Sequence, residues 1–375
     1  MRHSQKGFTL VEIMVALVIG LIAMVVIMQV FSLSESRKRS TTGGGDAQAN
    51  GAVAFLMLER DMKMAGWGLD TTAYKTCTTT KSYCNGTASC GGTAGAIPGL
   101  NFGSVQLVDG TSGAPDTVIT QYYANPTTST YRVPAISLLK GTMGTPADEL
   151  TVSSTTNCAV GDLMLIQEPT GGALGQCSLV QATLITPATL KMQHDTSGAF
   201  NPPATTQVAD GWVKHTAGAT VACIKKPSNG PFFQRRYTVD QVNRVLQRSD
   251  NATNPVQTNE VVTPEIVDMQ AQYGVAPTGS QDVNSWVDAT GSWAAPSAND
   301  IKRIKAIRVA IVARSAQYEK PAKGEACVST TADMAAKWSS WATFKTSAYP
   351  ADWNCYQYKS FETIIPLRNV IWSNL

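Results

Sequence analysis

The sequence predicts an α+β protein in which a long hydrophobic N-terminal helix leads into a globular domain with an antiparallel β-sheet and disulfides. From Ile13 to Ser34 the chain carries no charged residue, and a helix of that length spans about 33 Å, enough to cross a bilayer core of about 30 Å. Further along, short runs rich in Val, Ile, Leu, Thr and Tyr lie between Gly, Pro and Asn turns, which is the pattern of strands. The 8 cysteines favour disulfides formed in an oxidising compartment.

Composition narrows the class of protein further. A chain of 375 residues can bury a substantial core, and a hydrophobic share of 43% excludes wholesale disorder. Charged residues make up only 15%, against about 25% in an average soluble protein. With its many Thr, Ser and Gly, the chain is therefore expected to have an extracytoplasmic β-rich surface. A net charge of +3 gives no general case for nucleic-acid binding.

The apolar segment has two simple interpretations, and neither accounts for Glu12. A secretory signal peptide would have an apolar core of about 7–15 residues followed by a small-residue cleavage site, whereas this run is longer and has no such site. A plain signal anchor fits the length. It leaves Glu12 unexplained, because a charge at the centre of a membrane helix costs roughly 2.5–3.5 kcal/mol, less near an end, and such residues usually have a partner.

Residues 6–12 read Lys-Gly-Phe-Thr-Leu-Val-Glu, and this stretch resembles the leader junction of type IV prepilins. The resemblance implies that a prepilin peptidase cleaves after Gly7 and methylates the new N-terminus at Phe8. It also implies that Glu12 pairs with the amine of a neighbouring subunit, which would offset the desolvation of its carboxylate. The implied location is a single-pass inner-membrane protein with a periplasmic C-terminal domain that later joins the extracellular pilus, at its tip.

Basic residues flank the apolar segment on both sides, with Arg2 and Lys6 before it and Arg37, Lys38 and Arg39 after it. The positive-inside rule alone would not place the N-terminus in the cytoplasm, but the leader motif and the cysteines do. The basic triplet either meets anionic lipid headgroups or is solvated charge at a helix end.

The sequence divides into five parts. We expect a leader peptide over 1–7, a transmembrane and assembly helix over 8–40, a glycine break over 41–45, an amphipathic second helix over 46–68, and one β-rich domain over 69–375. The break is interpreted as a hinge, a melted stretch or a simple loop, because each glycine costs about 1 kcal/mol relative to alanine inside a helix.

The second helix has an apolar face that is expected to pack on a sheet. Phe55, Leu58, Met62 and Ala65 recur at helical spacing. Opposite them, Glu59 and Lys63 form an expected i, i+4 pair on the exposed side. Gly66 and Gly68 flank Trp67 and are expected to end the helix.

Three stretches together resemble the PilW family of minor type IV pilins and the related minor pseudopilin J of type II secretion. They are residues 56–68 (LMLERDMKMAGWG), 307–315 (IRVAIVARS) and 361–369 (FETIIPLRN). The resemblance therefore covers residues 1–68 well and about 300–375 moderately, and the region between matches nothing that we recognise.

Several strands can be placed within the domain. The alternation of Ile307, Val309, Ile311 and Ala313 with a mixed set of residues predicts a half-buried strand. Near the C-terminus, the apolar pairs at 364–365 and 370–371 suggest two strands separated by Pro366. The other expected strands are 106–109, 117–123, 162–167, 178–185 and 236–239.

The disulfide candidates are Cys77, Cys84, Cys90, Cys158, Cys177, Cys223, Cys327 and Cys355. Cys327 and Cys355 enclose an aromatic loop whose closure would stabilise the fold by about 3–4 kcal/mol. Cys158 and Cys177 flank a strand and are plausible partners. Cys223 is then left to pair within the group at 77–90, although the sequence alone leaves the connectivity open.

The aromatic loop between Cys327 and Cys355 contains Trp338, Trp341, Phe344, Tyr349 and Trp353. Aromatic residues are enriched at interfaces, which would make the loop a binding surface. Clustered aromatics are more often buried against one another, so a small satellite core is the favoured interpretation.

No motif indicates catalysis, and we expect no enzyme, no catalytic residue, no cofactor and no metal site. The only histidines beyond the leader are His194 and His215, which leaves a Ser–His dyad possible but unsupported. The oxygen-rich stretch 250–260 lacks the spacing of a calcium loop. The basic residues at 302–308 could meet DNA phosphates, but a solvated strand face is the favoured interpretation.

The sequence thus favours a PilW-like minor pilin that acts in initiation or tip assembly of the fibre, with consequences for twitching motility and adhesion. Its expected partners are the prepilin peptidase, the other minor pilins and the major pilin, with no nucleic acid. The alternatives are a type II secretion pseudopilin, and a pilus-tip adhesin or DNA-uptake receptor that uses Trp338 and Trp341.

Overall fold

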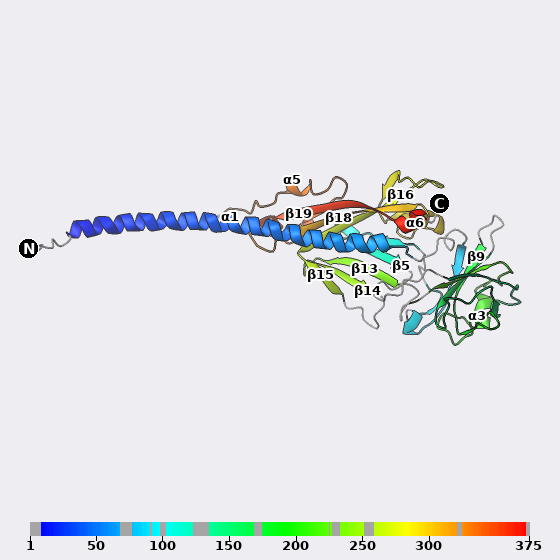
Figure 1. The fold of residues 1–375 in the computed structure, drawn as a ribbon. Helices are drawn as coiled ribbons and strands as arrows, with labels where there is room; N and C mark the ends of the chain where they lie inside the picture. Colours follow the sequence, from blue (N-terminus) through cyan, green and yellow to red (C-terminus); the bar gives the residue numbers. More distant parts are fainter. Residues whose placement is uncertain are drawn as a thin grey trace, which may run out of the picture.

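One long helix runs along a lobe of two β-sheets, and a second β lobe lies beyond the C-terminal end of that helix (Figure 1). We call them the helix-packed lobe (residues 103–122 and 233–372) and the distal lobe (residues 77–97 and 135–224). The two lobes have separate hydrophobic clusters. The computed structural model describes residues 9–67, 77–90, 92–97, 103–122, 135–168, 175–224, 226, 233–250, 259–319, 321 and 325–372.

Helix α1 runs without interruption from Leu10 to Met64, so the break expected at 41–45 is wrong. Glycines in this part of α1 allow close packing of the helix against the sheet and do not interrupt the helix. A Cβ on Gly43 would lie 3.1 Å from the Ser315 Cβ, and one on Gly51 would lie inside van der Waals contact with the Phe361 ring. Glycine lets the helix backbone approach the sheet at these points, and packing against the lobe outweighs the low helix propensity.

The C-terminal end of α1 is tied to other elements. Gly66 has φ +78° and a Cβ there would lie 2.9 Å from the Ser104 Cβ, so only glycine fits the turn. The Gly66 N–H donates to the Gln121 carbonyl at 2.8 Å. The Asn369 Nδ2 donates to the Ala65 carbonyl at 3.0 Å, which satisfies a backbone acceptor at the helix end.

The helix-packed lobe consists of two sheets with antiparallel pairing. The five-stranded sheet has the order β15-β14-β13-β5-β4, formed by Glu260–Pro264, Val245–Asp250, Phe233–Asp240, Thr117–Tyr122 and Val105–Val108. The four-stranded sheet has the order β17-β16-β18-β19, formed by Ser285–Val287, Ile266–Val275, Ile304–Arg314 and Tyr358–Pro366. The short helices of this lobe are α4 (Ala298–Ile301), α5 (Ala332–Ala335) and α6 (Arg368–Trp372).

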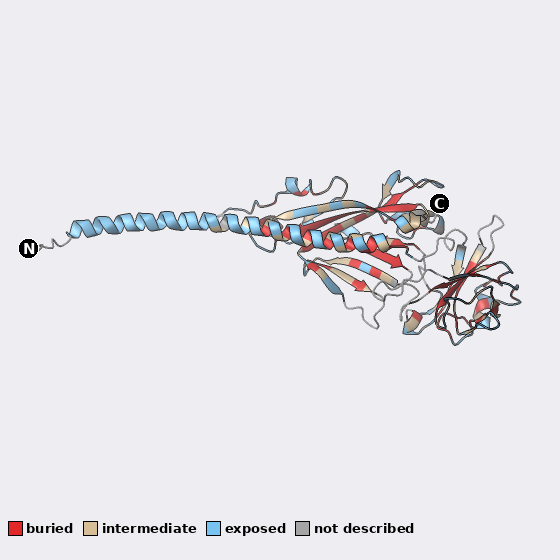
Figure 2. Cartoon of the chain, viewed as in Figure 1, coloured by how far each residue is buried: buried red, intermediate tan, exposed pale blue. Residues whose placement is uncertain are grey.

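The core of the helix-packed lobe lies between α1 and the two sheets. Ala54, Leu58, Met62 and Ala65 of the α1 segment are fully buried there, and Phe55 packs against them partly buried. This confirms the apolar face predicted from the sequence. Figure 2 shows the contrast along the helix, with buried residues only in the half that lies on the lobe.

Strand β18 is buried on both faces, so the half-buried strand expected for residues 307–314 is wrong. Ile307 and Val309 face α1 in the main core. Ala310 and Val312 are covered by the aromatic loop on the opposite face. Charged and apolar residues share that face of β18, so the strand's own sequence does not predict its burial. The side chains that cover it come from the aromatic loop, which lies further along the chain.

Residues 370–371, expected as a strand, lie in helix α6, whereas residues 364–365 lie in β19 as expected. Pro366 ends the strand because it has no N–H to donate to a ladder. The Leu367 N–H returns to the Lys305 carbonyl at 2.9 Å, after which the chain turns into the helix.

The distal lobe has a five-stranded sheet of order β1-β9-β8-β12-β6, formed by Cys77–Lys81, Gly175–Gln181, Leu163–Gln167, Thr220–Ile224 and Ala135–Leu138. The β1–β9 pair is parallel and the others are antiparallel. A three-stranded sheet combines β10 (Leu184–Thr186), β11 (Lys191–Gln193) and β7 (Leu150–Thr151), and a small hairpin pairs β2 (Cys84–Asn85) with β3 (Ala94–Gly95). Helix α3 spans Ala204–Ala209.

Both faces of the five-stranded sheet are buried in the distal lobe. On β8, Leu163 and Leu165 enter one hydrophobic cluster, and Met164 and Ile166 enter the other. A continuous apolar run of this kind is typical of a strand covered on both sides.

Candidate functional site: the apolar helix and its attachment to the sheets

The first described turn of α1 is closed by Thr9 and Glu12. The Glu12 N–H donates to Thr9 Oγ1 at 3.2 Å, and the Thr9 N–H donates to Glu12 Oε2 at 3.2 Å. This capping box satisfies backbone donors at the helix start, and the Thr-x-x-Glu spacing could have predicted it. Gly7 and Phe8, the residues of the expected cleavage and methylation, lie outside the described residues.

The first half of α1 presents apolar side chains on all sides. Large side chains from Leu10 to Leu33 are more than half exposed, with Leu10 at 75% and Phe31 at 72%. The described residues contain one helix long and apolar enough to cross a membrane. An apolar surface of this extent marks contact with a membrane or with other chains.

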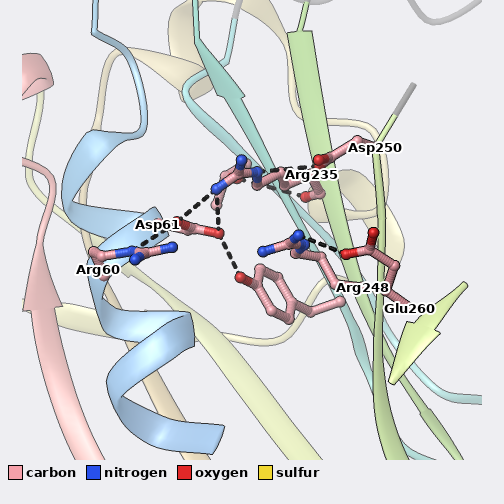
Figure 3. A network of polar contacts seen from close by, with 8 residues as sticks. Arg60, Asp61, Arg235, Arg248, Asp250 and Glu260 are labelled. Atoms are coloured by element: carbon pink, nitrogen blue, oxygen red, sulfur yellow. Dashed lines mark hydrogen bonds and ion pairs between the residues drawn. The ribbon is translucent and has the colours of Figure 1, made fainter. Parts of the chain in front are cut away.

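The second half of α1 is attached to the sheets by a buried polar network (Figure 3). Asp61 points from the helix toward Arg235 on β13, whose Nη1 lies 2.9 and 3.0 Å from the two carboxylate oxygens. The Tyr237 hydroxyl also donates to Asp61. The Arg235 Nε is 3.1 Å from Asp250 Oδ1 on β14.

Most members of this network have little contact with solvent. The side chains of Asp61 and Arg235 are 4% and 6% exposed. Burial, followed by the nearby Asp61 charge, raises the pKa of Tyr237, so its hydroxyl acts as a neutral donor. On the outer side of α1, Lys63 Nζ lies 2.7 Å from Glu59 Oε1, which confirms the pair expected from the sequence.

The distal lobe contains a hydrogen-bonded Ser–His–Glu arrangement that the sequence did not reveal. His215 Nε2 is 2.9 Å from Ser178 Oγ, and His215 Nδ1 is 2.8 Å from Glu168 Oε1. Burial lowers the pKa of His215, and the nearby Glu168 opposes that shift. Ser178 and His215 are 3% and 1% exposed, so the hydrogen bonds of the arrangement satisfy polar groups inside the distal lobe. The other histidine of the lobe, His194, is buried as well.

The aromatic loop forms a satellite core, the favoured interpretation from the sequence. Trp338 stacks on Tyr349 with ring centroids 6.2 Å apart and lies 4.8 Å from the Tyr358 ring. Phe344 is buried in the same cluster. These rings cover Val312 and its neighbours on β18, so they are not available as a binding surface.

The basic stretch near residue 305 is largely engaged within the protein. Arg303 Nη1 is 3.0 Å from Asp300 Oδ1. Arg308 donates to Gln272 Oε1 and lies 4.4 Å from the Trp341 ring centroid. These contacts fit a structural role for the basic residues better than phosphate binding.

The disulfide pairing differs in part from the expectation. Cys327 is joined to Cys355 as expected. Cys158 is joined to Cys223, so both the Cys158–Cys177 pair and the placement of Cys223 with the 77–90 group are wrong. Cys158 and Cys223 lie with the same cluster, whereas Cys177 faces the cluster on the opposite side of the sheet.

A further disulfide joins Cys84 to Cys90. Cys177 is also disulfide-bonded, and the side chain of Cys77 lies outside the described residues.

Residues 251–258 of the oxygen-rich stretch also lie outside the described residues. Its described ends, Asp250 and Glu260, lie close to Arg235 and Arg248 respectively.

Comparison with known proteins adds two family matches. Residues 230–369 match the family described as Type IV Pilus-assembly protein W, and residues 2–28 match the prokaryotic N-terminal methylation motif. No curated protein matches the chain. Among solved structures, a type IV-like pilin from Thermus thermophilus is 13% identical over 56% of this chain and 86% of that chain, with a TM-score of 0.20.

The methylation motif, the exposed apolar helix and the antiparallel sheets on which its second half lies define a type IV pilin-like protein. Within that class the chain is a PilW-like minor pilin. The family match runs from just before β13 to α6 and so covers most of the helix-packed lobe. The described distal lobe lies outside both matches.

Proposed function

We propose that this minor pilin initiates or caps the type IV pilus together with other minor pilins and the major pilin. Prepilin peptidase cleaves the chain after Gly7 and methylates Phe8. Before assembly, α1 spans the inner membrane, and both β lobes lie in the periplasm. The observation that carries the proposal is the division of α1, whose second half is buried in its own lobe while the large side chains of residues 10–33 are more than half exposed.

The proposed role of Glu12 follows from its place at the start of the apolar surface. Within the described residues, the Glu12 carboxylate accepts hydrogen bonds from the Thr9 N–H and hydroxyl. Inside a helical bundle the charge loses its water, and a partner of opposite charge becomes necessary. The amine created at Phe8 of a neighbouring subunit would supply that partner.

The proposed position at the filament tip is based on the size and position of the distal lobe. The distal lobe extends beyond the end of α1 (Figure 1), so it adds volume that a repeating subunit would have to accommodate at every step along the shaft. A subunit at the end of the filament has neighbours on one side only. The exposed lobe is then free of that restriction.

Deletion of the gene and complementation with variants tests the proposal. We expect deletion to reduce sheared surface pili and twitching, and the wild-type gene to restore both. Gly7→Val and Glu12→Ala should fail to restore them, whereas Glu35→Ala, a carboxylate change on the same helix beyond the apolar stretch, should succeed. Normal piliation in the deletion strain would refute the assembly role, and normal pili with lost exoprotein secretion would indicate a type II secretion pseudopilin.

A further inference from the structure

The distal lobe contains two buried histidines, and they differ in how their ring nitrogens are satisfied. His215 has a partner for each nitrogen, Ser178 for Nε2 and Glu168 for Nδ1. His194 is 3% exposed, and neither of its ring nitrogens has a hydrogen-bond partner among the described residues. Buried polar side chains are hydrogen-bonded in most proteins, so the His194 ring is an exception that requires an explanation.

His194 lies where a strand and a loop of the distal lobe meet. It directly follows β11, which pairs with β7. The loop that leads from β6 to β7, residues 139–149, passes the same place, and the backbone of Asp148 in this loop acts on the His194 ring. The Met143 N–H of the loop donates to the His215 carbonyl at 2.9 Å. The β6–β7 loop is therefore held next to both histidines.

The site of the His194 ring favours its neutral form. Burial lowers the pKa of His194, and the nearby His215 adds to that effect. The backbone of Asp148 and of His194 itself, and the charge of Asp195, act in the opposite direction but are outweighed. The other charged side chains in the β6–β7 loop, in residues 191–198 and around His215 are Lys140, Glu149, Glu168, Lys191 and Lys214. An imidazolium therefore does not fit this part of the core.

Two carboxylates near the ring offer a better place for its charged form. Asp195 is exposed and Asp148 is half-buried, and the charge of His194 lowers the pKa of each of them. A protonated ring that moved toward the surface would meet both carboxylates and regain water. The neutral ring is thus suited to the core and the charged ring to the surface, which is the arrangement that a pH switch requires.

We propose that His194 is an acid-responsive switch of the distal lobe: on acidification its ring takes up a proton, leaves the core toward Asp148 and Asp195, and releases the β6–β7 loop from β11. His215 remains in place, because Ser178 and Glu168 satisfy both of its ring nitrogens. The switch lies in the distal lobe and does not depend on filament assembly.

The direction of the pH response follows from the lowered pKa of His194. The open state binds a proton more readily than the closed state, so the lobe keeps its full stability above the ordinary histidine pKa of 6.5 and loses stability as the pH falls below that value. One such group shifts the opening equilibrium by at most about tenfold for each pH unit. The helix-packed lobe contains the buried carboxyl of Asp268, whose pKa is raised, and it should respond in the opposite direction.

Two measurements on the full chain in detergent micelles test the proposal. Because the chain has 3 histidines, ring signals of ¹³C-labelled histidine can be assigned through His3→Gln and His215→Gln, and the His194 ring should titrate below pH 6.5.

The second measurement is hydrogen exchange at pH 7.5 and pH 5.0, with protection factors corrected for the intrinsic effect of pH on amide exchange. We expect protection in residues 139–153 and 190–195 to fall on the order of tenfold at pH 5.0. Peptides from β18 in the helix-packed lobe should not lose protection.

His194→Phe removes the titrating group and keeps a ring in the core, so this variant should retain its protection at pH 5.0. His194→Leu is a second variant in case the larger ring does not fit. The matched control is His215→Gln, which keeps a donor and an acceptor for its two neighbours and should respond to acid as the wild type does. An equal acid response in the wild type and a folded His194 variant, unchanged protection of the wild type at pH 5.0, or a His194 ring that titrates at or above pH 6.5 would overturn the proposal.

Discussion

Asp61 of α1 and Arg235 of β13 form an ion pair almost wholly shielded from solvent, with both carboxylate oxygens within 3.0 Å of one guanidinium nitrogen. The pair links the long helix to the five-stranded sheet next to the apolar contacts of the main core. A buried ion pair contributes little more to folding stability than a well-packed apolar pair of similar size. Loss of one partner, in contrast, leaves an uncompensated buried charge.

We therefore predict that Asp61→Ala destabilises the attachment of α1 by about 3 kcal/mol, at the lower end of the range for breaking a buried pair, because Asp250 remains beside Arg235. Two-state unfolding is not guaranteed for a chain with several hydrophobic cores, so the readout is hydrogen exchange of amides in the second half of α1. The control is Arg60→Ala, whose side chain is 59% exposed next to Asp61. Equal exchange in the two variants would contradict the prediction.

Alanine substitutions at two glycines of α1 are predicted to change the stability of the helix-packed lobe in opposite directions. A Cβ at Gly51 would come within 3.0 Å of three atoms of the Phe361 ring, whereas a Cβ at Gly45 would meet nothing within 4 Å. Gly51→Ala should destabilise the helix-packed lobe by about 1–3 kcal/mol through overpacking. Gly45→Ala should stabilise it by up to about 1 kcal/mol through helix propensity alone.

Denaturant titration followed by near-ultraviolet circular dichroism measures both changes. The two variants share the same chemical substitution in the same helix, so each is the control for the other. If both substitutions stabilised the lobe, glycine would not be required at position 51, and the close contact between α1 and Phe361 would be wrong.

These glycines also show where sequence reasoning reached its limit. The apolar face containing Leu58 and Met62 repeats at helical spacing, so its burial could be predicted. The run Gly43-Gly44-Gly45 was interpreted as a break because propensity is a local property. Only the positions of Ser315 against Gly43 and of Phe361 against Gly51, set by segments more than 250 residues further along, show that these two glycines allow close approach.

The burial of the second face of β18 and the pairing of Cys158 with Cys223 could not be predicted for the same reason. Alternation along residues 307–314 reports one buried face, whereas the second face is covered by a loop whose position the strand does not encode. Cys158 and Cys223 meet because both lie on one side of the distal sheet, which requires knowledge of the strand order. The Cys327–Cys355 pair could be anticipated, since the two residues enclose a short aromatic segment.

Asp268 on β16 provides a prediction about pH. Burial, opposed by hydrogen bonds from Gln270 and Tyr349, raises the pKa of Asp268 to about 6. A carboxyl whose pKa is raised by folding contributes stability that is complete below the unfolded pKa, near 3.8, and is lost as the pH rises through 6. Asp268→Asn keeps an acceptor and a donor for the two neighbours and cannot ionise.

We expect the wild-type protein to lose about 1–2 kcal/mol more stability than Asp268→Asn between pH 5 and pH 8. Denaturation midpoints at the two pH values, with the Trp338 cluster as the reporter, provide the measurement. Asp148→Asn is a suitable comparison, because hydrogen bonds from Thr145 lower the pKa of Asp148 and the group should not contribute to this window. A parallel pH response of wild type and Asp268→Asn would show that Asp268 is already ionised at pH 5.

The Ser178–His215–Glu168 arrangement makes a prediction about activity. Its hydrogen-bond order is that of a hydrolase triad, yet the serine hydroxyl lies in the core of the distal lobe. We expect a fluorophosphonate probe to leave the folded protein unlabelled. Ser178→Ala should instead destabilise the distal lobe by about 1–3 kcal/mol, because it leaves a buried acceptor of His215 without its partner. Probe attachment at Ser178 that disappears in a His215→Phe variant would show that the hydroxyl is accessible and activated, and the structural role would have to be abandoned.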